Sequence, residues 1–265
     1  MSYNRIKDLN IFIKKFKIKM EILEEYEGLK VGEIVRKNPK AAGIFSTMGI
    51  DFCCGGNVLF DEVCKSKGLD SQEVWQRVLN ISIESNSTNE LNFDSFDLDF
   101  LADYIVNVHH QYLYKNLPEV RFFVDKVFKK HGERFDYLPE LYELYNALEA
   151  DLVGHLPKEE NILFPFVKQM VHDIKNNTAP SSPFFGTVNN PIHIMHSEHE
   201  EAGTILHRLR EITHNYTAPE EACNSHLVML DKLKDLDRDL IQHIHLENNI
   251  LFPKIINLEE KYLAQ

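Results

Sequence analysis

Apolar residues recur at helical spacing through most of this chain, and β-type alternation is weak. Proline, glycine and polar segments divide the longer patterned region into four predicted helices, at residues 96–130, 138–172, 190–215 and 220–260. Pro118 is a predicted kink in the first helix, and Pro165 and Pro253 lie within the second and fourth. Antiparallel helices with such connections form an up-down bundle, so the pattern predicts an all-α fold.

A region of shorter helices precedes the bundle. The pattern predicts helices at 31–37, 41–47, after Gly55-Gly56 and at 72–79. A polar stretch without aromatic residues then has the composition of a linker. The predicted organisation is a basic extension at 1–27, a small helical domain at 28–83, a linker at 84–95 and the bundle at 96–265.

The first 19 residues hold Arg5 and five lysines against the single acid Asp8. They are consistent with a basic amphipathic helix at a membrane or partner surface. We favour a frayed tail, or an extension before a true start at Met20, where the patterned sequence begins. Lysines interrupt the apolar runs and no small-residue cleavage site follows, so a secretory signal is not expected. Nor is a membrane span, since no apolar run is long enough.

Composition narrows the function classes. The net charge is -12, with 41 acidic and 29 basic residues, and this argues against nucleic-acid binding. The 43% hydrophobic content is sufficient for a core. Four cysteines, two of them adjacent, do not make a disulfide scaffold, so we expect a reducing, cytoplasmic location.

The strongest feature is an internal duplication. The segment from His155 to Pro165, HLPKEENILFP, reappears from His243 as HIHLENNILFP, with seven of eleven positions identical. On a helix, a histidine and a glutamate four residues later share one face. A single pair of this kind is usually an ordinary surface contact, but the duplication and the core-type Ile-Leu-Phe that follows favour an inward face. Buried histidines and carboxylates are costly unless they are coordinated.

Each half also has a separate histidine: His110 lies 45 residues before His155, and His199 lies 44 residues before His243. The two halves can therefore converge four imidazoles and two carboxylates in the bundle centre. This ligand set suits iron or manganese, whereas structural zinc favours thiolates. We predict two iron ions bridged by Glu159 and Glu247.

Residues beside these ligands have predicted roles as well. Asp151 and Glu198 are candidates for holding the imidazoles, with solvated acids as the alternative. His109, beside His110, is predicted to point to another face and not to be a ligand, and His196 is an alternative ligand to His199.

Cys53 and Cys54 follow Phe52 and precede two glycines. The glycines permit a tight turn that can bring backbone amides close to a thiolate. Adjacent cysteines form only a strained disulfide. Ordinary buried cysteines are the alternative, but the pattern favours a reactive or iron-handling pair. For Cys64 and Cys223 we expect the ordinary role.

Four segments carry a resemblance to a known family: Asp51-Phe-Cys-Cys-Gly-Gly56, Ser197-Glu-His-Glu-Glu-Ala-Gly203 and the two copies of the repeat. From about residue 28 onward the chain resembles hemerythrin-like domains, and more closely the di-iron proteins for repair of iron centres. The resemblance implies a small cysteine-bearing domain before a hemerythrin-like four-helix bundle, and a homodimer. It implies the ligands His110, His155, Glu159, His199, His243 and Glu247. It also offers His131 as a fifth imidazole, although Lys129-Lys130-His131-Gly132 is typical of an exposed helix end.

The resemblance further implies restoration of iron-sulfur clusters damaged by nitric oxide or oxidants. The di-iron centre would supply the iron, as a stoichiometric donor rather than a turnover catalyst, and damaged iron-sulfur proteins would be the partners. The alternatives are an oxygen or nitric oxide sensor or carrier, a di-iron nitric oxide reductase, and a helical interaction module whose histidines only pack.

Overall fold

The structure, a computed structural model, describes residues 28–84 and 91–263. The predicted basic extension at 1–27 and part of the predicted linker lie outside these residues. The described residues are helical apart from turns, loops and one isolated β-bridge, between Lys30 and Leu59, so the all-α prediction is confirmed. The chain divides into two compact units, Met1–Asp94 and Ser95–Gln265.

The described residues of the first unit form four helices around an aromatic core. They are α2 (Val31–Lys37), α3 (Ala41–Thr47), α4 (Phe60–Ser66) and α5 (Ser71–Glu84). Phe60 lies between Phe45 and Trp75, with ring centroids 5.8 Å and 4.3 Å away, and all three side chains are buried. Phe52 packs on Phe45 at 6.5 Å. Because Phe52 is buried, it anchors the loop that carries the cysteine pair.

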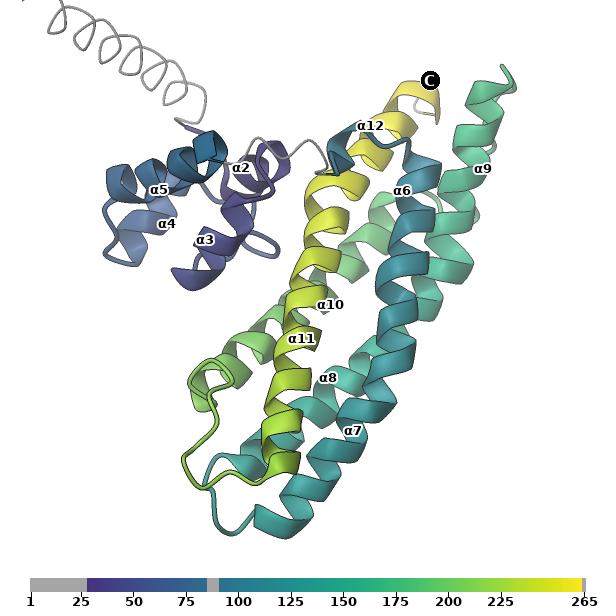
Figure 1. The fold of residues 1–265 in the computed structure, drawn as a ribbon. Coiled ribbons are helices and arrows are strands. Elements are labelled where there is room, and N and C mark those ends of the chain that lie inside the picture. The colour runs from purple at the N-terminus through teal and green to yellow at the C-terminus, as the bar shows by residue number, and fades with distance from the viewer. Residues whose placement is uncertain (1–27, 85–90, 264–265) are drawn as a thin grey trace, which may run out of the picture. The chain divides into compact units, whose positions relative to one another are not determined.

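The second unit is an up-down bundle of four long helices, three of which contain a wide π-helical turn (Figure 1). The first consists of α6 (Leu98–Tyr104), η2 (Ile105–His110) and α7 (Gln111–His131), and follows the short 3₁₀ turn η1 (Phe93–Ser95). The second consists of α8 (Leu138–Lys158), η3 (Glu159–Leu163) and α9 (Phe164–Lys175). The third is α10 (Asn189–Ile212). The fourth consists of α11 (Asn224–Leu246), η4 (Glu247–Leu251) and α12 (Phe252–Leu263).

The prolines of the repeat explain two of the π turns. Pro165 and Pro253 are each the second residue after a π segment, in the first turn of α9 and α12. A proline ring clashes with the carbonyl four residues earlier and has no amide to donate, and a wider turn removes this conflict. Pro118 lies inside α7, which is continuous from Gln111 to His131.

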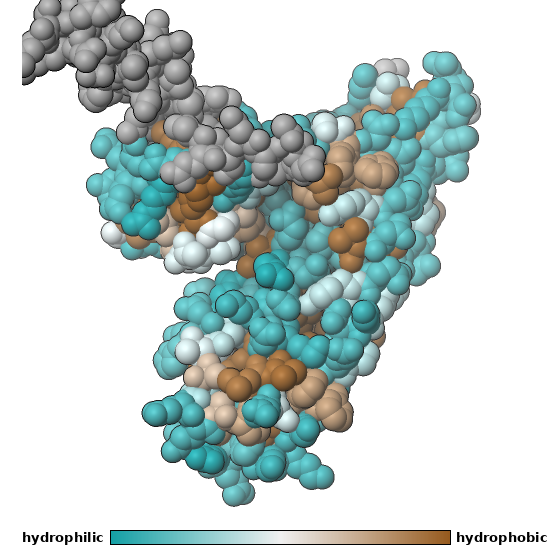
Figure 2. Space-filling model, in the orientation of Figure 1, coloured by the Kyte–Doolittle hydropathy of each residue, from teal (hydrophilic) through white to brown (hydrophobic). Residues whose placement is uncertain are grey.

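Apolar side chains fill the space between the long helices, where Leu113, Val120, Leu141 and Leu148 are fully buried. The outer surface of the bundle is mostly hydrophilic on the face shown in Figure 2. None of the helices in the described part of the chain is long and apolar enough to cross a lipid bilayer.

Candidate metal centre

Six of the predicted ligands meet inside the bundle, each at most 3% exposed. They come from all four long helices: His110 from η2, His155 from α8, Glu159 from η3, His199 from α10, His243 from α11 and Glu247 from η4. Three of the six therefore lie in π segments. Such turns are frequent at functional sites, because the wider turn moves side chains off the regular helical stripe.

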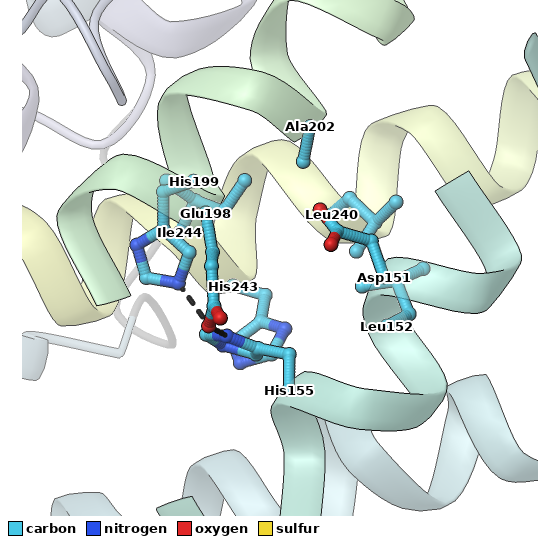
Figure 3. Close-up of a pocket in the computed structure, with 9 residues that line it drawn as sticks. All are labelled: Asp151, Leu152, His155, Glu198, His199, Ala202, Leu240, His243 and Ile244. Atoms are coloured by element: carbon cyan, nitrogen blue, oxygen red, sulfur yellow. Dashed lines mark hydrogen bonds and ion pairs between the residues drawn. The ribbon is translucent and has the colours of Figure 1, made fainter. Parts of the chain in front are cut away.

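The six side chains form two groups of four that share both glutamates. One group is His110, Glu159, His243 and Glu247, and the other is His155, Glu159, His199 and Glu247. Within each group the candidate ligand atoms lie within 4.8 Å of one another. The Nε2 atoms of each histidine pair are 3.2 Å apart, and Figure 3 shows the rings of His155 and His199 turned toward each other.

Each shared carboxylate directs one oxygen to each group. Glu159 places Oε2 3.3 Å from Nε2 of His110 and Oε1 3.2 Å from Nε2 of His155. Glu247 places Oε1 3.1 Å from Nε2 of His243 and Oε2 3.2 Å from Nε2 of His199. The two carboxylates thus lie between the histidine pairs.

The side chains of the centre leave carboxylate oxygens without hydrogen-bond donors, as is expected of a metal site. Both oxygens of Glu159 and Oε2 of Glu247 are buried and accept no hydrogen bond from the described residues. Leaving buried carboxylate oxygens without partners is costly, and cations at the two groups would remove that cost. Imidazole and carboxylate ligands together suit iron.

Without a metal, the charges in the centre are balanced by protons on histidine. Burial alone would raise the pKa of Glu247, but His243 and His199 lower it well below its usual range. Burial would likewise lower the pKa of His155, but Glu159 and Glu247 raise it to about 10. For His243 burial dominates and lowers the pKa. The metal-free centre therefore combines ionised glutamates with a protonated His155.

Side-chain oxygens hold three of the four imidazoles from the outside. Nδ1 of His155 donates to Glu198 at 2.7 Å, and Lys158 in turn donates to Glu198. Nδ1 of His110 donates to Glu160 at 2.8 Å, and Nδ1 of His199 donates to Asn248 at 2.8 Å; both acceptors were missed from the sequence. The signal for them was their shared place in the repeat, one residue after each shared glutamate.

Asp151, the other predicted partner, lines a small cavity beside His155 together with Leu152 and Ala202 (Figure 3). The outer nitrogen of His155 bonds to Glu198 instead.

The phenylalanines of the repeat support the lone histidines. The ring of Phe164 stacks on His110 with centroids 5.9 Å apart, and the ring of Phe252 stacks on His199 at 6.0 Å. The Ile-Leu-Phe segments thus supply core packing and fix the ligand rings.

His109 belongs to neither group of ligands, as predicted, but it is buried beside the centre and does not point to a separate face. It is 4% exposed, its ring lies on that of His243 at 5.5 Å and 8°, and its Nδ1 donates to Asp239 at 3.0 Å. The regular helical period places adjacent residues on different faces, but the wide turn of η2 buries both His109 and His110. His196 packs against the ring of Phe252 and belongs to neither group of ligands.

The structure does not bring His131 to this centre. His131 ends α7, 21 residues after His110, which is about 30 Å further along a helix. Its Nε2 lies 3.3 Å from the Sγ of Cys223, a partly exposed residue at the start of α11. Cys64 is buried, and burial raises its pKa to about 11.

The cysteine pair lies in a turn built around Asp51. The amides of Cys53, Cys54 and Gly55 all donate to the Asp51 carboxylate, at 2.9–3.0 Å, and not to a thiolate as we predicted. A Cβ on Gly55 would lie 3.1 Å from the carbonyl oxygen of Asp51, so the turn favours glycine there. Asp51, Cys53 and Cys54 form a third group with metal-ligand spacing.

The two thiols of this turn differ. Cys53 is buried and Cys54 is partly exposed, with the sulfur atoms 3.7 Å apart. The hydrogen bond to Cys54, burial and the charge of Asp51 together raise the pKa of Cys53 well above its usual value. Cys53 is therefore held as a thiol, and Cys54 is the more accessible of the two.

Comparison with known proteins finds a known domain family in each of the two units. The hemerythrin HHE cation binding domain matches residues 101–255, more than half of the chain, and the ScdA_N domain of unknown function matches residues 28–81. A probable iron-sulfur cluster repair protein of Haemophilus influenzae is 33% identical over 228 residues, covering 86% of this chain and 96% of the relative. The iron-sulfur cluster repair protein YtfE of Escherichia coli (strain IAI1) is 31% identical over 231 residues, covering 87% of this chain and 98% of the relative. The chain therefore belongs to the family of iron-sulfur cluster repair proteins with a hemerythrin HHE cation-binding domain.

Proposed function

We propose that this protein restores damaged iron-sulfur clusters by donating iron from a di-iron centre in its bundle. The observation that carries the proposal is the pair of buried four-residue groups that share Glu159 and Glu247. Each carboxylate offers one oxygen to each group, which is the arrangement that two bridged ions require. The clients are proteins whose clusters have been damaged by nitric oxide or oxidants.

The ligand set supports release of the metal as well as binding. Four neutral imidazoles and two carboxylates neutralise two divalent ions only in part, whereas a carboxylate-rich site would hold them more firmly. His155 can take up a proton when an ion leaves, since Glu159 raises the pKa of His155 in the metal-free centre. Bound iron serves here as the cargo that rebuilds the client cluster.

The cysteine pair is proposed to handle iron at the client. Cys54 is accessible enough to meet an incoming ion or a damaged cluster, and Cys53 lies close enough to add a second sulfur ligand. Asp51 fixes the turn through three amide hydrogen bonds. This gives the pair a defined geometry before any metal binds.

A transfer experiment with labelled iron tests the proposal. The protein is loaded anaerobically with ⁵⁷Fe and mixed with an iron-sulfur enzyme damaged by nitric oxide, which is then reisolated. We expect the label in the restored cluster, and little transfer from the double variant Cys53→Ser, Cys54→Ser. Cys223→Ser, which removes the other partly exposed thiol, is the matched control. An unlabelled cluster after recovery of client activity would refute donation.

One observation favours a second candidate, a sensor or carrier of oxygen or nitric oxide. The small cavity beside His155 and His199 has apolar walls that include Leu152, Leu240 and Ile244, which suit a small uncharged ligand. A reversible spectral change on gas exposure, together with unimpaired function of the double cysteine variant, would favour this candidate over repair. Formation of nitrous oxide from nitric oxide over multiple turnovers, in the presence of a reductant, would instead indicate a nitric oxide reductase.

A further inference from the structure

The duplication extends to the groups that surround the ligands. His110 corresponds to His199, and each donates its outer nitrogen to the residue that follows a shared glutamate. Each also stacks on the phenylalanine that ends its Ile-Leu-Phe segment. Within each histidine pair the two ring centroids are 4.9 Å apart and the ring planes are inclined at 57°. The two halves are therefore equivalent to a close approximation.

The residue before each lone histidine differs between the two halves. Glu198 precedes His199 and accepts a hydrogen bond from His155 at 2.7 Å. The corresponding residue before His110 is His109, which does not accept from His243 but lies flat against its ring. Within the described parts of the chain, Nδ1 of His243 has no hydrogen-bond partner, although the residue is only 1% exposed.

The difference has a consequence for metal affinity. An acceptor on the outer nitrogen fixes an imidazole and makes the coordinating nitrogen more basic, and its loss typically lowers metal affinity by about 10- to 100-fold. The group of His155 and His199 has both imidazoles held by oxygen acceptors. In the group of His110 and His243, only His110 is held in this way.

We propose that the two metal positions are unequal and that the ion held by His110 and His243 is released first. His109 acts as the positioning residue, because it occupies the place where the other half has an acceptor and is itself bound to Asp239. This inference rests on the proposed di-iron centre and identifies the position that gives up iron.

Release kinetics test the inference. The protein loaded with two ferrous ions is mixed with excess coloured ferrous chelator in a stopped-flow instrument. We expect two phases of one iron each, with rates that differ by about 10- to 100-fold. Glu198→Gln weakens the acceptor of His155, so it should accelerate the slow phase and leave the fast phase unchanged. His109→Glu places an acceptor beside His243, so it should slow the fast phase.

Glu201→Gln, at an exposed site on the same helix as Glu198, is the control and should change neither phase. If His109→Glu does not fold, as judged by circular dichroism, the release rates of the wild type and of Glu198→Gln still test whether the two positions differ. A single release rate for both ions, or a slow phase unaffected by Glu198→Gln, would overturn the inference while labelled-iron transfer could still succeed. Failure of the wild type to load iron would remove the proposed function, and this inference with it.

Discussion

Protons and metal ions compete for the same nitrogen atoms in this centre. At pH 7 the metal-free chain holds a proton on His155, because Glu159 and Glu247 raise the pKa of that imidazole to about 10. A metal ion binds only the neutral form, so binding must displace the proton. Affinity should therefore fall as the pH is lowered.

We expect iron loading near pH 7 to release at least one proton per chain. A pH indicator in weakly buffered solution measures this directly during titration with ferrous ion. The variant Glu119→Gln, altered at an exposed residue on α7, should release the same number. Loading with no proton release, or an affinity that rises as the pH falls, would contradict the charge balance described for the centre.

The two adjacent cysteines should react at different rates. Cys53 is buried and its pKa is raised well above the usual value, whereas Cys54 is partly exposed. Because only the thiolate is nucleophilic, iodoacetamide at pH 8 should modify Cys54 at least about 10-fold faster. Peptide mapping by mass spectrometry gives both rates, with buried Cys64 as the slow reference. Faster modification of Cys53 would show that the Asp51 turn is assigned wrongly.

At the scale of elements, the π turns join the helices to the centre. η3 starts at Glu159 and η4 at Glu247, and the helix after each turn begins with the phenylalanine that stacks on a lone histidine. The wide turn thus sets the rotation of the second half of a helix relative to the ligands in its first half.

Deleting Asn161, an exposed residue of η3, should convert that turn to regular helix, because a π turn holds one residue more than the α-helix that it interrupts. The helices on either side would keep their register, but the shortened turn would no longer direct Glu159 to the two groups and Glu160 to His110 as the wide turn does. We expect lower iron content and a lower melting temperature. Deletion of Ser181, in the exposed loop before α10, is the matched control. Equal iron content in the two deletion variants would show that iron binding does not depend on the π turn.

The same turns mark the limit of what the sequence could predict. The bundle and the convergence of the six side chains followed from helical period and duplication, because these depend on spacing alone. The burial of His109 did not, because a π turn changes the period locally. The acceptors Glu160 and Asn248 were missed although each follows a shared glutamate of the repeat, since regular spacing does not place them against a ring on another helix. His131 came from resemblance only, and the length of α7 separates it from the centre.

At the scale of the whole molecule, the chain consists of two compact units with separate cores. The metal ligands of the bundle all lie in Ser95–Gln265, and the cysteine pair lies in Met1–Asp94. Ions that bind the folded bundle should stabilise that unit alone.

Calorimetry of the full chain should therefore show two transitions, of which iron shifts only one. With free ferrous ion at about 100 times the dissociation constant, one site adds about 2.7 kcal/mol to the free energy of unfolding of the bundle. The transition of the N-terminal unit should keep its temperature while the cysteine pair is blocked by alkylation. A single transition, or equal shifts of two, would mean that the unfolding of the two units is coupled.

The most direct test of the central claim is the number of iron ions per chain after anaerobic loading and removal of free metal. We predict two for the wild type, and fewer for His243→Ala and Glu247→Ala, with the greater loss for Glu247→Ala because that carboxylate serves both positions. A wild-type chain that retains one ion or none, or variants that retain the full two, would contradict the account.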